Sequence, residues 1–206
     1  MIEIIENAVQ LAVLTICMVL SADYSYRKQN RESAILAMFY GSYVLGDLYW
    51  LLYLICYGYT PRVFYVAEMS WYAAYVFLHL FLLRLAPKEE RKTVFLPAWL
   101  GPVFAAGMCA FFIYKWGDYF GNLMTAALMS LLIFNCIRGL YYTGKHPEEA
   151  SRRRIYLIAL AFCLLEYITW VVSGYDNLVN LYYCLDFLLT PCIVLLLPAF
   201  RKAVDA

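Results

Sequence analysis

The chain has 206 residues, of which 65% are hydrophobic and only 15% are charged, with a net charge of +1. A soluble domain is usually close to half apolar and a quarter charged. This composition therefore argues against a soluble domain and favours an integral membrane protein.

The apolar residues come in runs of about 20, and each run is long enough to cross about 30 Å of hydrocarbon as an α-helix. The runs do not alternate apolar and polar residues, which excludes membrane β-strands. The expected spans are, in chain order, 5–22, 34–57, 62–85, 94–114, 120–142, 154–174 and 178–199. The predicted fold class is all-α, a polytopic bundle of seven transmembrane helices that forms a single transmembrane domain over 1–206.

The basic side chains indicate the orientation of these spans. With seven spans, fourteen of the sixteen Lys and Arg residues fall on one side, and only Arg62 and Lys115 fall on the other. Because Lys and Arg are enriched in cytoplasmic loops, the N-terminus is expected outside and the C-terminus inside. The short loops favour the plasma (inner) membrane of a bacterium.

Two stretches of the chain resemble each other in sequence. Aligning 40–59 with 160–177, and 64–68 with 182–186, pairs residues of the same kind. The pairs are Asp47 with Glu166, Trp50 with Trp170, and Glu68 with Asp186. We predict two parallel three-helix repeats, at about 1–86 and about 119–200, joined by a connecting helix at about 94–114.

This three-plus-one-plus-three plan, with the N-terminus outside, resembles the SWEET sugar transporters and the PnuC vitamin transporters. The resemblance covers the whole chain, but it is one of organisation and carries no motif. It implies a transporter and, on the PnuC side, a cationic substrate of the nicotinamide riboside or thiamine kind. The chain lacks the PQ pair of the SWEET family, which argues against a sugar.

Four carboxylates lie inside expected spans rather than at their ends, namely Asp47, Glu68, Glu166 and Asp186. A carboxylate at mid-bilayer costs about 2.5–3.5 kcal/mol, and no Lys or Arg lies deep in any expected span. Their positions along the spans place all four in the outer half of the bundle. Because lipid will not accept them, we expect them to face inward and to meet in a common chamber.

Aromatic side chains share the helix faces of these acids at three- and four-residue spacing. They are Tyr43, Trp50, Trp71, Tyr72, Tyr75, Trp170 and Tyr182. Acids among aromatic rings suit an organic cation, although Tyr and Trp also form interfacial belts. The first interpretation is a binding or transport protein for a small cationic or amphiphilic molecule, held in an acidic, aromatic-lined pocket that opens to the outer face.

Two other interpretations remain open. Some positions resemble the lysoplasmalogenase (YhhN-like) family, whose members cleave the vinyl ether of lysoplasmalogens. These positions are Gly46-Asp47, Tyr75 with His79, and Leu165-Glu166. The resemblance implies Asp47 and Glu166 as the catalytic acid–base pair, but that family has Asp and Ser where this chain has Glu166 and Leu165. The third interpretation is a receptor or sensor subunit with a cytoplasmic protein partner on its basic loops.

The sequence lacks the motifs of several kinds of metal-binding and cofactor-binding site. The chain has two His and seven Cys without a CxxC pair, so no metal site is expected. No cofactor is expected either, because there is no Walker or Rossmann glycine pattern and no Lys in the last span to hold retinal. An enzyme is the less favoured class. The expected partners are membrane lipids and a small molecule, and a nucleic acid is not expected.

Overall fold

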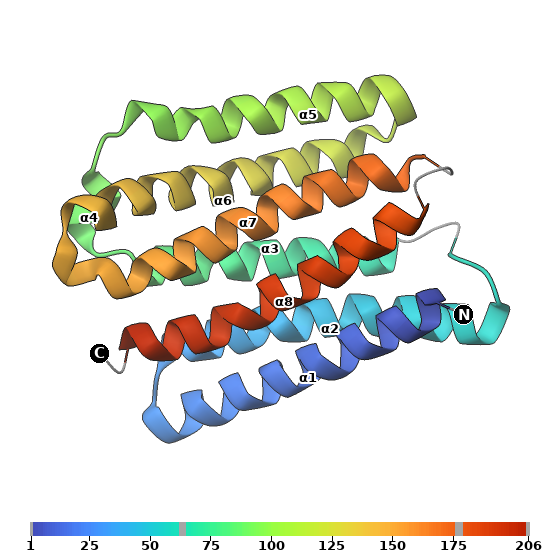
Figure 1. Cartoon of the computed structure of the whole chain (residues 1–206), viewed down its shortest axis with the longest axis horizontal. Helices are drawn as coiled ribbons and strands as arrows, with labels where there is room; N and C mark the ends of the chain where they lie inside the picture. Colours follow the sequence, from blue (N-terminus) through green and yellow to red (C-terminus); the bar gives the residue numbers. More distant parts are fainter. Residues whose placement is uncertain (1, 62–64, 176–178, 205–206) are drawn as a thin grey trace. The chain divides into compact units, whose positions relative to one another are not determined.

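A computed structural model of the chain describes residues 2–61, 65–175 and 179–204. These residues form helices and no strand, which confirms the predicted all-α class (Figure 1). The α-helices are α1 (Ile2–Lys28), α2 (Arg31–Tyr57), α3 (Tyr65–Leu85), α4 (Lys88–Lys92), α5 (Leu100–Trp116), α6 (Tyr119–Lys145), α7 (Ala150–Ser173) and α8 (Val179–Val204). Two short 3-10 helices, η1 (Leu96–Trp99) and η2 (Pro147–Glu149), precede α5 and α7.

Within the described ranges, seven helical segments are long and apolar enough to cross a membrane. They are Glu3–Lys28, Arg31–Tyr57, Val66–Leu85, Leu96–Trp116, Tyr119–Lys145, Pro147–Ser173 and Leu181–Val204. Large apolar side chains such as Leu157, Leu164 and Ile168 of α7 stay exposed, as a lipid-facing surface requires. The predicted number of spans is confirmed, and the chain is a multi-pass membrane protein.

The chain divides into two compact units, Met1–Leu78 and His79–Ala206. Unit 1 contains α1, α2 and most of α3, and unit 2 contains the end of α3 and all later helices. This division does not coincide with the predicted repeats, and it does not test whether the chain arose by duplication.

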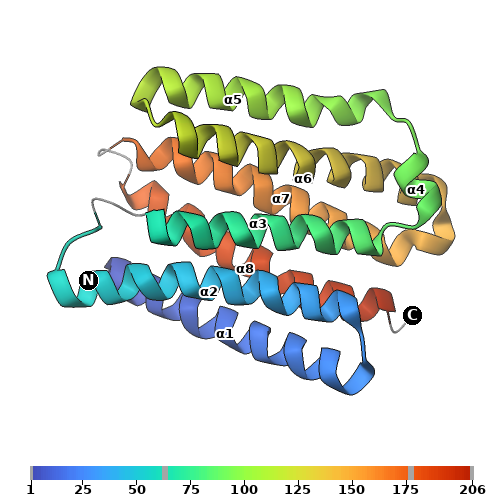
Figure 2. The same ribbon diagram turned by 180° about the vertical axis from the view of Figure 1, so that it is seen from behind.

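In unit 1, α1 and α2 form an antiparallel hairpin with a sharp elbow (Figure 2). Gln29 takes a left-handed backbone conformation, with φ 51, and so reverses the chain after α1. Asn30 then caps α2, because its side-chain oxygen accepts the Ser33 N–H at 2.7 Å. The Ser33 hydroxyl donates to the Ser21 carbonyl at 2.8 Å, which ties the two helices together beside the elbow.

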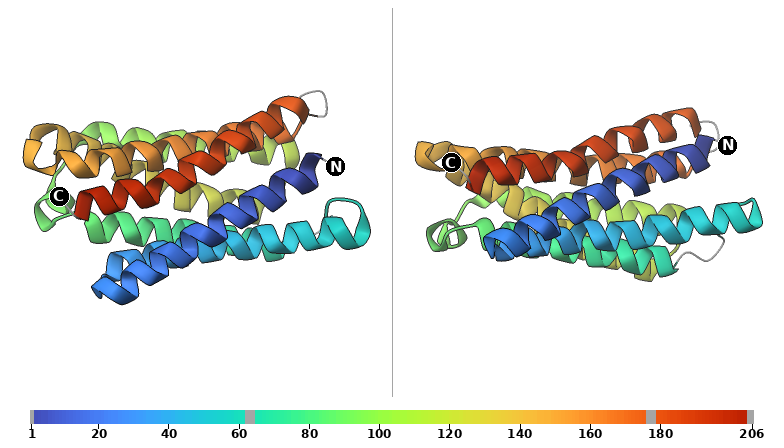
Figure 3. Two further views of the ribbon diagram at one scale, coloured as in Figure 1. Left: turned by 60° about the horizontal axis from the view of Figure 1, so that its bottom comes forward. Right: turned by 90° about the horizontal axis from the view of Figure 1, so that it is seen from below.

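In unit 2, the helices α5, α6, α7 and α8 pack as successive neighbours along the chain (Figure 3). Gly117 ends α5 with φ 93, and Asp118 begins α6 by accepting the Gly121 N–H at 3.2 Å. Helix α8 continues through Pro191 and Pro198 without a break. The two prolines therefore do not divide the last helix of this unit.

Candidate functional site

The best-defined of the predicted site residues are Asp47 on α2 and Trp71 on α3, both in unit 1. The Trp71 indole Nε1–H donates to Asp47 Oδ1 at 3.3 Å. Asp47 is only 2% exposed. A hydrogen bond with a charged acceptor stabilises the negative charge, so the indole helps to hold a carboxylate in this buried position.

Gly46 allows the Trp71 ring to lie so close to α2. A Cβ on Gly46 would come within 2.5 Å of Trp71 Nε1 and 2.9 Å of its Cδ1, closer than real Cβ atoms approach other atoms. Any larger residue would therefore push the ring away. Gly46 and Asp47 therefore position Trp71 together: the glycine leaves space for the indole ring, and the aspartate accepts its N–H.

A second indole lies beside the first. The rings of Trp50 and Trp71 are 6.0 Å apart between centroids, at an interplanar angle of 40°. The Trp50 Nε1–H donates to Glu3 Oε1 at 3.2 Å. Each indole is thus oriented by a carboxylate, and the two aromatic faces together provide a surface of the kind that attracts cations.

Helix α1 also contributes acids to unit 1, which sequence analysis did not predict. Glu6 is 2% exposed, like Asp47 and Glu68. The Asn7 amide donates to Glu6 Oε2 at 2.9 Å. Glu3, Glu6 and Gln10 follow each other at helical spacing on α1, and this polar stripe is the signal that could have identified them.

Charge is distributed unevenly along unit 1. The Lys and Arg residues of its described part are Arg27, Lys28 and Arg31, all at the elbow between α1 and α2. Asp47 comes sixteen residues after Arg31 on α2, which corresponds to about 24 Å along the helix axis. The elbow also contains Asp23 and Glu32 but is basic on balance, and the buried acids and the indoles lie away from it.

The predicted tyrosines of unit 1 lie in its interior. Tyr43, Tyr72 and Tyr75 are all buried. The rings of Tyr72 and Tyr75 are 6.5 Å apart, and Tyr43 packs edge-on against Phe39 at 5.7 Å. The three tyrosines thus belong to the interior of the unit that holds Asp47, and their part in ligand binding stays a prediction.

The other predicted residues belong to unit 2. Glu166 on α7 is 5% exposed, whereas Trp170, Tyr182 and Asp186 are only partly buried. The Tyr182 ring contacts Tyr183 at 5.4 Å. The four predicted acids thus divide into one pair in each unit, and their meeting in a common chamber stays a prediction. The same holds for Asp47 and Glu166 as the acid–base pair of a hydrolase.

Comparisons with protein-family models, curated proteins and solved structures found no match. Among the described residues, no group of three or more His, Cys, Asp or Glu side chains is placed to hold a metal ion.

The ring of His79, which falls in unit 2, is oriented by a hydrogen-bond chain from Arg138. Arg138 Nη2, which can only donate, bonds to Asn135 Oδ1 at 2.6 Å. The Asn135 amide nitrogen therefore faces His79 Nδ1, at 3.2 Å, and donates to it. His79 Nδ1 is then the acceptor of this bond, which leaves Nε2 as the donor nitrogen of the ring.

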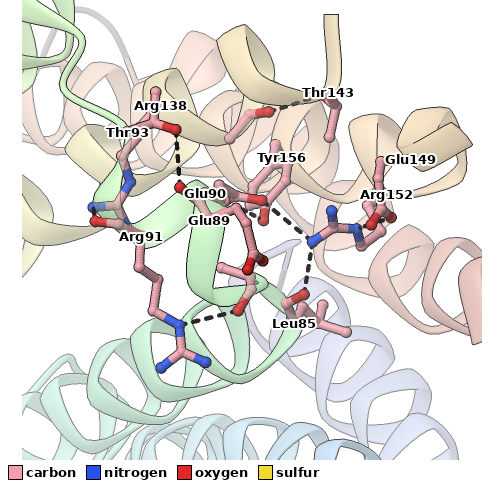
Figure 4. Close-up of polar contacts among 12 residues, drawn as sticks. Leu85, Glu89, Glu90, Arg91, Thr93, Arg138, Thr143, Glu149, Arg152 and Tyr156 are labelled. Atoms are coloured by element: carbon pink, nitrogen blue, oxygen red, sulfur yellow. Dashed lines mark hydrogen bonds and ion pairs between the residues drawn. The ribbon is translucent and has the colours of Figure 1, made fainter. Parts of the chain in front are cut away.

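Unit 2 also contains a buried polar cluster that sequence analysis did not predict (Figure 4). Glu90 of α4 is 1% exposed. Its Oε1 accepts the Tyr156 hydroxyl at 2.7 Å, and its Oε2 accepts Arg152 Nη1 at 3.2 Å. Burial raises the pKa of the Glu90 carboxyl, and this effect outweighs the hydrogen bond from Tyr156 and the nearby guanidinium groups.

Two basic side chains of this cluster have a structural role besides their place in the Lys and Arg count. Arg138 and Arg152 are both buried, at 8% and 7% exposed. Arg152 also donates to the Leu85 carbonyl at 2.7 Å and to Glu149 at 2.8 Å. Besides Asp47, Glu68 and Glu166, the acids Glu6 and Glu90 are buried as well.

Proposed function

We propose that the protein binds a small organic cation among the acids and indoles of unit 1 and carries it across the plasma membrane. The observation that supports this function best is the pair of indoles, Trp50 and Trp71, with centroids 6.0 Å apart beside the buried Asp47. An aromatic face and a carboxylate both attract a positive charge, and they are combined here at one place.

The expected interaction energies favour a cation over a neutral ligand. Each indole contributes about 0.5–2 kcal/mol to binding a cation, with the larger value for a desolvated one. Asp47 and Glu68, both 2% exposed, add charge attraction that a neutral molecule of the same shape does not receive. A ligand with a positive charge and an apolar body therefore gains from both kinds of group.

The proposal includes the orientation with the N-terminus outside. The basic elbow of unit 1 (Arg27, Lys28, Arg31) would then lie in the cytoplasm, as basic loops generally do. The acids and indoles would open toward the outer face, where a ligand enters. The predicted repeat gives Glu166 and Asp186 of unit 2 the sequence positions that Asp47 and Glu68 have in unit 1.

A matched pair of ligands tests the binding step on the purified full-length protein. Choline and its neutral carbon analogue 3,3-dimethyl-1-butanol have nearly the same shape and differ in charge. Titration calorimetry with this pair, with tetramethylammonium and with thiamine should show tighter binding of the cations, by about tenfold or more, which is about 1.4 kcal/mol. Equal affinity for choline and its neutral analogue, or no binding by any cation, contradicts the proposal.

A matched pair of variants locates the site. Asp47→Asn keeps the shape of the side chain and removes its charge, so cation affinity should fall strongly. Asp23→Asn is the control, because Asp23 is an exposed residue of the same unit that pairs with Arg27. Uptake of the bound cation into proteoliposomes then separates a transporter from a binding protein. Unchanged affinity in Asp47→Asn would place the ligand elsewhere.

A further inference from the structure

Helix α4, in the loop between α3 and α5, has no buried apolar side chain. Glu90 is the one buried residue of the short helix α4. Further along the loop, Val94 and Leu96 are highly exposed, at 92% and 78%. A carboxylate, rather than an apolar side chain, therefore provides the interior anchor of this helix.

Charged and titratable groups face Glu90 from every element packed against it (Figure 4). Helix α7 supplies the Tyr156 hydroxyl and the Arg152 guanidinium. Helix α6 supplies Arg138, which also donates to the Arg91 carbonyl at 3.3 Å, and η2 supplies Glu149. The carboxyl thus bonds α4 to α7, while the Arg91 carbonyl bonds it to α6.

The loop has fixed points on both sides of Glu90. Before α4, Arg152 Nη1 donates to the Leu85 carbonyl at 2.7 Å. After α4, the Phe95 ring stacks on Tyr141, with centroids 3.8 Å apart. The residues between these points, which we call the α4 segment (86–94), can leave the bundle only if Glu90 is withdrawn from its buried position.

We propose that Glu90 is a proton-binding site that latches the α4 segment to unit 2, docked when the carboxyl carries a proton and released more easily when it does not. Protonation leaves each of the two groups that bond to the Glu90 carboxyl with an acceptor. Arg152 keeps its bonds to the Leu85 carbonyl and Glu149, and the neutral carboxyl still accepts the Tyr156 hydroxyl. This inference does not depend on the cation proposed for unit 1.

The direction of the pH effect follows from the burial of Glu90. A carboxyl that is buried when docked and hydrated when released has the higher pKa in the docked state, as the raised pKa of Glu90 indicates. Docking of the α4 segment is therefore strongest when the pH is below the pKa of the hydrated carboxyl. It weakens as the pH rises through the higher pKa that the carboxyl has in the docked state. A pKa difference of one between the two states corresponds to about a tenfold change in the docking equilibrium.

Hydrogen exchange read by mass spectrometry tests the latch on the full-length protein in lipid nanodiscs. After correction for intrinsic exchange rates, protection of the α4 segment should fall about tenfold or more between about pH 5 and about pH 9. In Glu90→Gln, which keeps the shape and stays neutral, the segment should remain protected across this range. Glu89→Gln changes an exposed neighbour on the same helix and should keep the wild-type profile.

Peptides from α1 and α2 report whether the rest of the fold is unchanged in each variant. No pH dependence in the wild type, or the same dependence in Glu90→Gln, overturns the latch. The cation experiments do not decide this outcome, because their site lies in unit 1 and the exchange of the α4 segment is measured without ligand.

Discussion

The phenol ring of Tyr156 lies against the backbone of Gly139, where a Cβ would come within 2.5 Å of the ring carbon Cζ. The same arrangement occurs in unit 1, where the Trp71 indole lies against Gly46. Each ring crosses a neighbouring helix at the glycine, and its polar edge then donates to a buried carboxylate. Neither glycine has a positive φ, so the missing side chain, not backbone freedom, is the reason for glycine at both positions.

Gly139→Ala should destabilise the protein. The added methyl group has no space beside Tyr156, and overpacking of this kind typically costs about 1–3 kcal/mol. The control is Gly144→Ala on the same helix, where an added Cβ meets nothing within 4 Å. Thermal unfolding in detergent should show a lower midpoint for Gly139→Ala and an equal or slightly higher one for the control, since Ala favours helix by about 0.5–1 kcal/mol.

Gly46→Ala should weaken cation binding by moving the Trp71 ring away from Asp47. The matched change is Gly41→Ala, also on α2, where the added Cβ meets only the flexible Met18 side chain, with its sulfur at 3.2 Å. In protein labelled with 5-fluorotryptophan, the ¹⁹F resonance of Trp71, assigned through Trp71→Phe, should shift in Gly46→Ala and stay in place in Gly41→Ala. An unmoved resonance together with normal affinity would mean that the glycine does not position the indole.

Tyr156→Phe removes the hydroxyl that Glu90 Oε1 accepts at 2.7 Å. The loss of one partner of a buried polar group costs about 1–3 kcal/mol, because the remaining group stays away from water. We expect a lower unfolding midpoint and faster amide exchange in α4. Tyr114→Phe changes a residue that is 87% exposed on α5 and should have almost no effect. Equal midpoints for the two variants would contradict a structural role for this hydrogen bond.

Asp47 and Trp71 could be predicted from sequence, whereas Glu90 could not. A carboxylate inside an apolar run stands out because lipid will not accept it, and helical spacing identifies the aromatic residues on its face. Glu90 lies in the sequence KEERK, where nothing distinguishes it from the exposed charges around it. Its burial depends on Tyr156 and Arg152, more than 60 residues later in the chain, and local patterns carry no information about such contacts.

The contact of Trp71 with Gly46 and Asp47 could not be predicted from the sequence either. The Gly46-Asp47 pair drew attention through its resemblance to a hydrolase motif, yet the partner of both residues is an indole on the next helix. That contact depends on how α3 is aligned along α2. Periodicity places Trp71 on the face of Glu68, but it does not fix the alignment of one helix against another.

The stability of the protein should depend on pH through Glu90. The pKa of its carboxyl is raised in the folded state, mainly by burial. The stability linked to this group is therefore fully present below the pKa of the unfolded chain and is lost as pH rises through the raised folded value. Glu90→Gln cannot lose a proton, so its unfolding midpoint should exceed that of the wild type by an amount that grows with pH.

This difference is measured as the midpoint of Glu90→Gln minus that of the wild type, in one detergent, from about pH 5 to about pH 9. Taking the difference cancels titrations that both proteins share. Glu89→Gln, a change of the same kind at an exposed neighbour, should give a difference that does not vary with pH. A constant difference for Glu90→Gln would show that Glu90 keeps one protonation state over this range. A difference that shrinks with pH would mean that the guanidinium groups of Arg152 and Arg138 outweigh burial and lower the pKa of Glu90.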